Sequence, residues 1–277
     1  MPVRNGAATI EAQLAALSAQ TFRRPWEVVV VNDASTDDTA AIAMLWINKV
    51  PRLSILSLVE SRGESHARNV GTRASRGPLV AYCDADDVVS EKWLENIVQP
   101  LSQHAMATGP IDLSQLNPIG RYSWRRASRI AELPRWMGFL APVVGCNMAV
   151  RRETFDLMGG FDELLVSGQD YDFAFRVQLA GESIGFAPHA LVHQRLRAGW
   201  SYFRRSFEYG LGHVELYRRF RDKGLRPQRI RGAARLVGAG LGAPLALVPK
   251  YRYGWLLLAG MELGRLKGST IARMLFL

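Results

Sequence analysis

Two aspartates one residue apart could hold a divalent cation. Asp84 and Asp86 follow an apolar run at residues 79–83, where the chain must turn, so both carboxylates can face one crevice. Carboxylate oxygens suit Mg²⁺ and Mn²⁺, and a cation held there can neutralise a departing phosphate as a Lewis acid. A single Asp-x-Asp is more often a solvated turn, here with Asp87 capping the next helix. The metal hypothesis therefore depends on the other motifs of the chain.

Asp170 is the candidate general base. It begins a helical pattern at residues 170–180, two residues after Gly168, where the positive end of a helix would keep a carboxylate ionised. An ionised carboxylate can accept a proton from a hydroxyl group. Asp172 competes for this role, but Arg176 follows it by one helical turn and is its expected ion-pair partner.

Alternating strand-like and helix-like runs predict an α/β fold with a mostly parallel sheet flanked by helices. The predicted strands lie at residues 27–31, 53–58, 79–83, 143–150 and 183–187, and the predicted helices follow the capping residues Thr9, Ser65 and Ser90. Polar clusters follow two of the strands, at Asp33 and Asp84, and ligands bind beyond the carboxyl ends of parallel strands. Both clusters are therefore expected in one crevice. Residues 103–142 lose the alternation and predict a long surface segment or lid.

The basic character of the chain belongs to its last part. The net charge is +10, but residues 1–194 hold 18 Lys/Arg against 21 Asp/Glu, whereas residues 195–277 hold 17 against 4. Basic residues there flank apolar side chains at helical spacing, namely Trp200, Phe203, Phe207, Leu211 and Val214. Basic residues are also interleaved with the apolar runs at residues 255–258 and 274–277. This pattern is typical of helices that lie on an anionic bilayer, and the alternative is a helical cap on the preceding domain. The longest uncharged stretch of this last part, Leu236 to Pro249, is 14 residues, whereas a helix that spans a membrane needs about 20 apolar residues.

Five motifs, in this order, resemble the family 2 glycosyltransferases. They are Pro2-Val3-Arg4-Asn5, residues 31–37, residues 67–71, residues 83–87, and residues 159–163 followed by Gln169-Asp170. The resemblance implies a GT-A fold, a nucleotide-sugar donor, Mg²⁺ or Mn²⁺ as cofactor and inversion at the anomeric carbon. Gln169 stands where the family usually has Glu. A hydrophobic strand usually precedes the first motif, so the sheet is expected to lack its first strand unless the true start lies upstream.

The resemblance also implies roles for individual residues. Donor-binding roles fall on Pro2, Val3, Arg4, Asn5, Asp33, Gly63, Arg68, Asn69, Asp84 and Ala85, metal-binding roles on Asp84, Asp86 and His193, and the catalytic role on Asp170. His193 ends an apolar run and has a structural role as its alternative. Gly145 and Asn147 are expected to line the sugar pocket, because small residues let a ligand approach the backbone.

These observations predict a GT-A catalytic domain at residues 1–195 and a basic amphipathic helical tail at residues 196–277. Residues 1–100 would bind the donor, with UDP as the default nucleotide, and residues 101–195 would carry the acceptor and catalytic part. We expect a glycan or lipid-linked acceptor, in cell-surface polysaccharide or glycolipid assembly, and no nucleic-acid partner. Cys83 and Cys146 lie in apolar runs and are expected to be buried free thiols. With no signal segment visible, they suggest a cytoplasmic protein, peripheral on the inner face of the membrane.

Three other functions are less consistent with the sequence. A haloacid-dehalogenase-type phosphatase would use Asp84 as nucleophile and Asp86 as acid and base, but it leaves residues 32–37 and 159–163 unexplained. A nucleic-acid binder is suggested by the pI near 10, and the near-neutral residues 1–194 argue against it. A sugar nucleotidyltransferase would carry a glycine-rich basic loop after its first strand, where this chain has only residues 5–8.

Overall fold

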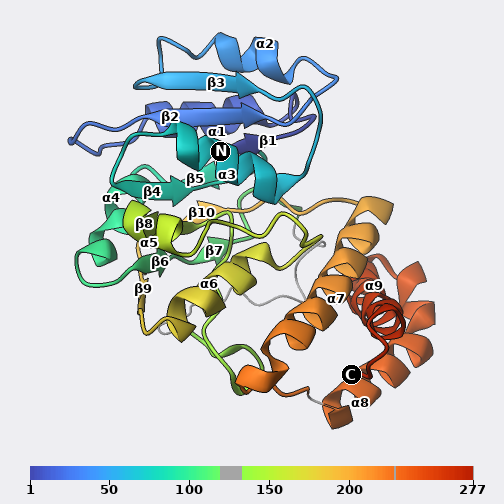
Figure 1. Cartoon of the computed structure of the whole chain (residues 1–277). Helices are drawn as coiled ribbons and strands as arrows, with labels where there is room; N and C mark the ends of the chain where they lie inside the picture. The colour runs from blue at the N-terminus through green and yellow to red at the C-terminus, as the bar shows by residue number, and fades with distance from the viewer. Residues whose placement is uncertain (119–132, 228, 277) are drawn as a thin grey trace.

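The chain forms an α/β part followed by three long helices (Figure 1). The computed structural model describes residues 1–118, 133–227 and 229–276. Sheet A contains the parallel strands β1 (Pro2–Val3), β2 (Val28–Asn32) and β3 (Leu53–Ser57), in that order. Alternate valines of β2 pack on opposite sides, against α1 (Ile10–Ser18) and α3 (Glu64–Ala74). The predicted α/β arrangement of parallel strands flanked by helices is confirmed.

Two further sheets complete the α/β part. Sheet B has the order β4-β8-β6-β9, from β4 (Leu79–Tyr82), β8 (Met148–Arg151), β6 (Met106–Thr108) and β9 (Ile184–Phe186), and β8 is antiparallel to both of its neighbours. Sheet C has the order β5-β10-β7, from β5 (Val88–Val89), β10 (Val192–His193) and β7 (Ile111–Asp112). β6 and β7 lie inside the predicted surface segment 103–142, because strands of two or three residues are too short to give a visible alternation. Residues 119–132 of that segment lie outside the described residues.

The first strand of sheet A is short. β1 pairs only with Val31 and Asn32, the last two residues of β2. The first strand of the sheet is therefore present, as Pro2 and Val3. A groove beside it runs between β2 and β4 and is lined by Val28, Val29 and Val80. The lining also includes Arg68 and the strand β4 as far as Cys83, so the groove extends to the residue that precedes Asp84.

The remaining helices of the α/β part are α2 (Thr39–Met44), α4 (Trp93–Val98), α5 (Arg152–Leu157) and α6 (Gln169–Leu179). The predicted caps are wrong in detail. Thr9 precedes α1, but its hydroxyl donates to the Gly6 carbonyl instead of capping the helix. Helix α3 begins at Glu64, so Ser65 lies inside the helix. Gly63 precedes the helix with a φ of 92°, a backbone conformation that glycine adopts readily. Helix α4 begins at Trp93, three residues after Ser90.

The last part of the chain folds as α7 (Trp200–Phe220), α8 (Arg229–Leu241) and α9 (Pro249–Ile271), grouped beside the α/β part (Figure 1). Glycines let α7 and α9 touch: a Cβ on Gly264 would lie 2.1 Å from the Phe207 carbonyl oxygen. Leu216 of α7 packs with Phe175 of α6. Much of the apolar face predicted to meet a membrane is therefore covered, with Val214 buried, although Trp200 is 72% exposed. This packing of α7 on α6 is what the helical-cap alternative predicts.

Acid is expected to destabilise the contact between α7 and α9 through His213. Arg265 Nη2 donates to His213 Nδ1 over 2.9 Å, which requires a neutral ring. Burial, together with Arg265 and Arg235, lowers the pKa of His213 to about 3. An unfolded histidine has a pKa of about 6.5, so below that pH the unfolded chain takes up a proton that the folded chain does not. The free energy of unfolding therefore falls as the pH drops from about 6.5 toward about 3.

The His213→Gln variant tests this linkage, because glutamine keeps a hydrogen-bond acceptor and does not titrate. Since the His213 side chain is partly exposed, we expect wild type to lose about 1–2 kcal/mol more than the variant between about pH 6.5 and about pH 4.5. Urea unfolding at several pH values measures the difference. Parallel pH profiles for the two proteins would mean that His213 is not linked to folding.

Candidate active site

The Asp84–Asp87 turn forms the acidic centre of the site. It joins β4 to β5, and the side chains of Ala85 and Asp87 are buried whereas those of Asp84 and Asp86 are half-buried. Asp84 and Asp86 are thus the two accessible carboxylates of the turn. Arg68 of α3, which is 3% exposed, donates to Asp84 Oδ1 over 2.8 Å. The buried guanidinium thus holds one carboxylate of the predicted pair in place.

Arg68 also brings Asp170 to this centre. Asp170 lies in the first turn of α6, and its Oδ2 accepts a hydrogen bond of 2.9 Å from the backbone N–H of Gly145. A Cβ on Gly145 would lie 2.8 Å from Arg68 Nη1, so only glycine leaves room for the guanidinium there. The charge of Arg68 acts on both Asp84 and Asp170. The predicted base and the predicted metal pair, far apart in sequence, are therefore neighbours.

Burial dominates the electrostatics of these carboxylates. It raises the pKa of Asp84 to about 6, against the stabilising charge of Arg68 and with a further contribution from Glu64. Burial also raises the pKa of Asp86 and of Asp170. For Asp170 this corrects the expectation that the helix end keeps the carboxylate ionised: burial opposes ionisation more than Arg68 and the Gly145 N–H favour it.

Glu64, Arg197 and Arg205 join the site without having been predicted. Glu64 forms ion pairs with Arg68 over 2.6 Å and with Arg205 of α7 over 3.4 Å. The charges of Arg197 and Arg205 lower the pKa of Asp86, against the larger effect of burial. The excess of arginine in the last part of the chain indicated that these residues could pair with negatively charged groups. The sequence did not indicate that Glu64 is one of these groups, because 141 positions separate Glu64 from Arg205.

A second group of ligand atoms lies deeper. Oxygen or sulfur atoms of Asp84, Asp87 and Cys146 lie within 4.8 Å of one another. Burial raises the pKa of Asp87 to about 8 and that of Cys146 well above its usual value. A protonated thiol is a poor ligand for a hard cation, so the accessible Asp84 and Asp86 suit Mg²⁺ or Mn²⁺ better. Cys83 and Cys146 are both buried and free, as predicted.

His193 lies next to the acidic turn. On β10 it is paired with Val88 of β5, two residues after Asp86. Its Nδ1 is 2.8 Å from Asp112 Oδ2, an arrangement that orients the ring. A carboxylate behind a histidine is frequent where Nε2 binds a metal, so the ligand role of His193 stays a prediction.

The predicted nucleoside residues gather around the loops after β1, β2 and β3. Asp33 is buried, and its carboxylate accepts hydrogen bonds from Ser61 Oγ over 2.6 Å and from the Arg62 N–H over 3.2 Å. Arg4 donates to the same serine over 2.8 Å. Asn5 has a φ of 51° and accepts from the Thr36 N–H, which ties the first motif to the second. Pro2 and Val3 form β1 beside them.

The amides of two predicted donor-binding residues form hydrogen bonds within the protein. Asn69 is 1% exposed, and its amide bonds to Phe161 and to Glu163 Oε1. Asn147 is fully buried: its Nδ2 donates to the carbonyls of Pro110 and Ala190, and its Oδ1 accepts from the Trp93 indole. Neither amide is left to contact a sugar. Gly145 and Ala85 are also buried, and Gly145 makes room for Arg68 instead of lining a pocket.

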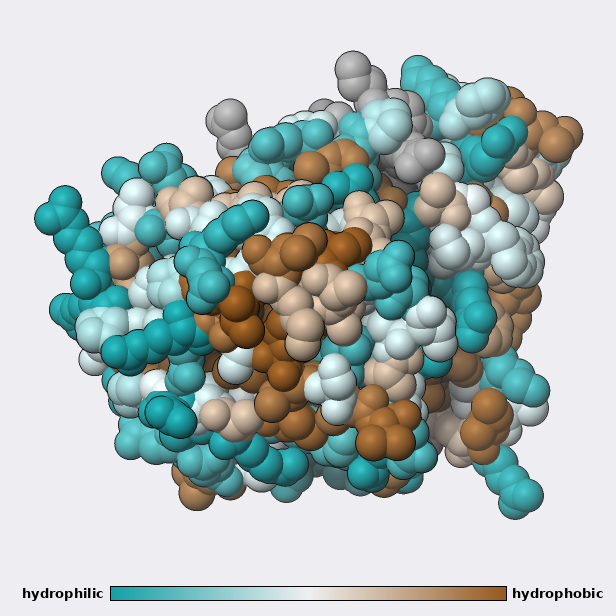
Figure 2. All heavy atoms as spheres, turned by 90° about the horizontal axis from the view of Figure 1, so that it is seen from above, coloured by the Kyte–Doolittle hydropathy of each residue, from teal (hydrophilic) through white to brown (hydrophobic). Residues whose placement is uncertain are grey.

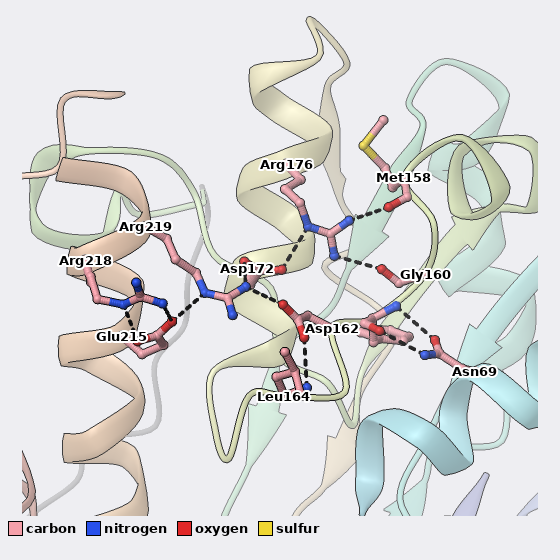
Figure 3. A network of polar contacts seen from close by, with 11 residues as sticks. Asn69, Met158, Gly160, Asp162, Leu164, Asp172, Arg176, Glu215, Arg218 and Arg219 are labelled. Atoms are coloured by element: carbon pink, nitrogen blue, oxygen red, sulfur yellow. Dashed lines mark hydrogen bonds and ion pairs between the residues drawn. The ribbon is translucent and has the colours of Figure 1, made fainter. Parts of the chain in front are cut away.

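A network of ion pairs connects α6 with α7, and Asp172 is part of it (Figure 3). Asp172 is 1% exposed and bonds to Arg176 over 2.8 Å and to Arg219 of α7 over 3.3 Å. Arg176 also donates to the carbonyls of Met158 and Gly160. The predicted pairing of Asp172 with Arg176 is confirmed. Because Asp172 is buried and paired with two arginines, Asp170 is the better candidate for the base.

Comparisons with known proteins agree on one family. The model described as Glycosyl transferase family 2 matches residues 1–158. Glycosyltransferase AglE of Haloferax volcanii is 27% identical over 78% of this chain and 72% of its own length. The succinoglycan biosynthesis protein ExoU of Rhizobium meliloti is 31% identical over 69% of this chain, and the chain spans 57% of its length. The family match includes the acidic turn.

Among solved structures, the mannosyltransferase PcManGT of Pyrobaculum calidifontis, in complex with GDP-Man and Mn²⁺, is similar to this chain with a TM-score of 0.73. The match covers 96% of this chain and 85% of PcManGT, at 22% sequence identity. At that identity the likeness concerns the fold, and it confirms the predicted GT-A type. It includes the carboxyl-terminal helices, because it covers nearly the whole chain.

Proposed function

Because this chain belongs to glycosyl transferase family 2, we propose that it transfers a sugar from a nucleotide-sugar donor, with Asp170 as base and Asp84, Asp86 and His193 holding a divalent cation. The observation that carries the proposal is the convergence of Asp84 and Asp170 on the buried guanidinium of Arg68. A phosphatase built on Asp84 and Asp86 would need neither Asp170 nor the loops around Asp33. Family membership decides between the two enzyme classes.

The donor set suits Mg²⁺ or Mn²⁺. Asp84 and Asp86 offer half-buried carboxylates, and the Asp86 side chain forms no ion pair with the described residues. The Mn²⁺ bound by PcManGT supports the same choice. When bound, the cation would neutralise charge that develops on the diphosphate leaving group. Arg197 and Arg205 supply further positive charge at this place.

Different residues of the chain would act on the acceptor and on the donor. An acceptor hydroxyl oxygen bonds to the anomeric carbon while the bond from that carbon to the diphosphate oxygen breaks, and Asp170 takes the hydroxyl proton. Attack from the face opposite the leaving group inverts the anomeric centre. Asn5, Asp33 and Gly63 shape the loops that would receive the nucleoside. We propose a glycan or lipid-linked acceptor in surface polysaccharide or glycolipid assembly, which the relationship to ExoU supports.

Nucleotide binding tests the donor and metal assignments. We expect one nucleoside diphosphate from a panel that includes UDP and GDP to stabilise wild type when Mn²⁺ is present. At about 100 times its dissociation constant a ligand adds about 2.7 kcal/mol to the free energy of unfolding. Asp86→Ala should lose the Mn²⁺-dependent part because it loses a metal ligand. Thermal unfolding with and without Mn²⁺ measures both.

The matched control is Asp156→Ala, which removes an exposed carboxylate on α5. It should keep the full nucleotide effect. Equal stabilisation of Asp86→Ala and wild type would contradict the metal role of Asp86. If no nucleotide stabilised folded wild type, the proposed donor class would be wrong.

A further inference from the structure

We propose that the turn between α8 and α9 docks on an anionic membrane surface and holds the active site beside it. The docking turn comprises the end of α8, the 3₁₀ helix η5 (Ala243–Leu247) and the first turn of α9. The proposal deepens the proposed function, because it assigns the acceptor to a lipid surface and locates the contact. It also narrows the membrane contact expected of residues 196–277 to this turn.

The docking turn exposes large apolar side chains. Its exposed apolar residues are Val237 (59%), Leu241 (79%), Leu245 (43%), Leu247 (81%), Val248 (41%) and Tyr251 (46%). Val237 and Leu241 lie one helical turn apart on α8, and the others follow within ten residues, so all six belong to one short segment of the chain. None of the described helices is long and apolar enough to span a membrane. An apolar surface of this kind suits insertion into the boundary of a bilayer.

The positive charge near the docking turn favours an anionic membrane surface as its partner. The sequence has no Asp or Glu between Asp222 and Glu262, whereas it has seven Lys or Arg there. Lys250 and Arg252 are exposed at the docking turn itself. Exposed apolar side chains beside exposed basic ones, in a stretch of sequence without acidic residues, complement the headgroups of anionic phospholipids. This complementarity favours a membrane over a second copy of the chain, whose docking turn carries the same positive charge.

Contacts fix the docking turn next to the active site. The Trp255 indole of α9 donates to the Ala239 carbonyl of α8 over 2.9 Å, which holds the two helices together. The Gly199 N–H donates to Tyr253 Oη over 3.3 Å. Four residues before Gly199, Arg195 Nε donates to the Asp86 carbonyl over 3.2 Å. A short segment of chain therefore separates the docking turn from the acidic turn, within reach of an acceptor headgroup in the membrane.

Another exposed apolar area serves as the comparison. Figure 2 shows hydrophobic side chains gathered on the face that carries α2 and β3 at the top of Figure 1. Met44, Leu45 and Ile47 are 61%, 69% and 47% exposed. Asp37 and Asp38 precede this segment, so it lacks the purely basic flanks of the docking turn. Leu45→Glu therefore makes a matched control for an apolar-to-acidic change at an exposed site.

Flotation with vesicles tests the proposal. We expect the full chain to bind vesicles of phosphatidylcholine with phosphatidylglycerol, and to bind pure phosphatidylcholine vesicles at least about tenfold more weakly. Leu241→Glu combined with Leu247→Glu should lower binding to the anionic vesicles by at least about tenfold. Lys250→Glu should also weaken it, most clearly at low salt. Leu45→Glu should bind as wild type does.

Three outcomes would overturn the proposal: equal binding to both kinds of vesicle, unchanged flotation of the double variant, or weaker flotation of Leu45→Glu to the same degree. Light scattering adds a further one, since a dimer that the double variant converts to a monomer, without vesicle binding, would make the docking turn a self-interface. The nucleotide effect with Mn²⁺ is measured on every variant. If it persists while vesicle binding fails, only the docking proposal is lost, whereas its absence in wild type counts against the proposed function.

Discussion

Replacing Asp170 by asparagine is expected to lower the rate of sugar transfer by about 100-fold or more, the usual contribution of a general base. Asparagine keeps the shape of the side chain and an oxygen that can accept from the Gly145 N–H. It cannot take a proton from the acceptor. Donor binding should remain, because the acidic turn and the nucleoside loops are unchanged. Single-turnover transfer assays, with nucleotide binding measured on the same preparation, separate the two effects.

The control for this prediction is Asp172→Asn. Asp172 carries no proposed catalytic role and pairs with Arg176 and Arg219 (Figure 3), so its loss should lower stability more than the rate per folded molecule. Burial raises the pKa of Asp170, so wild-type transfer should slow toward acid at a higher pH than for an exposed aspartate, whose pKa is about 3.9. Near wild-type transfer by Asp170→Asn would assign the base to another group.

Replacing Arg68 by methionine is expected to lower the free energy of unfolding by about 3 kcal/mol. The Arg68 side chain is 1% exposed and pairs with Glu64 and Asp84, whose side chains are 30% and 28% exposed. Removing one partner of a buried ion pair costs about 3–5 kcal/mol, and the partial exposure of both carboxylates places this case at the lower end. Urea unfolding measures the change.

The variant should also bind the nucleotide more weakly, since Asp84 is no longer held at the turn. Binding is measured at saturating Mn²⁺, at a temperature where the variant is folded. Arg204→Met is the matched control: Arg204 is 79% exposed at its side chain and pairs with Glu208 over 3.5 Å, so its loss should cost about 0.5 kcal/mol or less. If the two substitutions changed stability and nucleotide binding equally, the central role of Arg68 in the site would be contradicted.

The sequence by itself determined the α/β fold and the family. The valine run of β2 and the spacing of Ile10, Leu14 and Leu17 predicted a strand and a helix that the structure contains. Motif order predicted a glycosyltransferase, and the family match agrees. The pairing of Asp172 with Arg176 was also predictable, because residues four apart on a helix are neighbours whatever the rest of the chain does.

Only the tertiary structure decided which side chains share the site. The positions of the motifs assigned Asn69 and Asn147 to donor binding. In the structure their side-chain amides form hydrogen bonds with residues about 90 and about 40 positions further along the chain. The sequence pattern turned α7 toward a membrane, whereas the fold uses α7 to bring Arg205 to Glu64 and leaves the docking turn exposed. A local pattern records the period of a helix or strand. Long-range packing fixes which face is covered and which charges meet, because distant segments compete for the same partners.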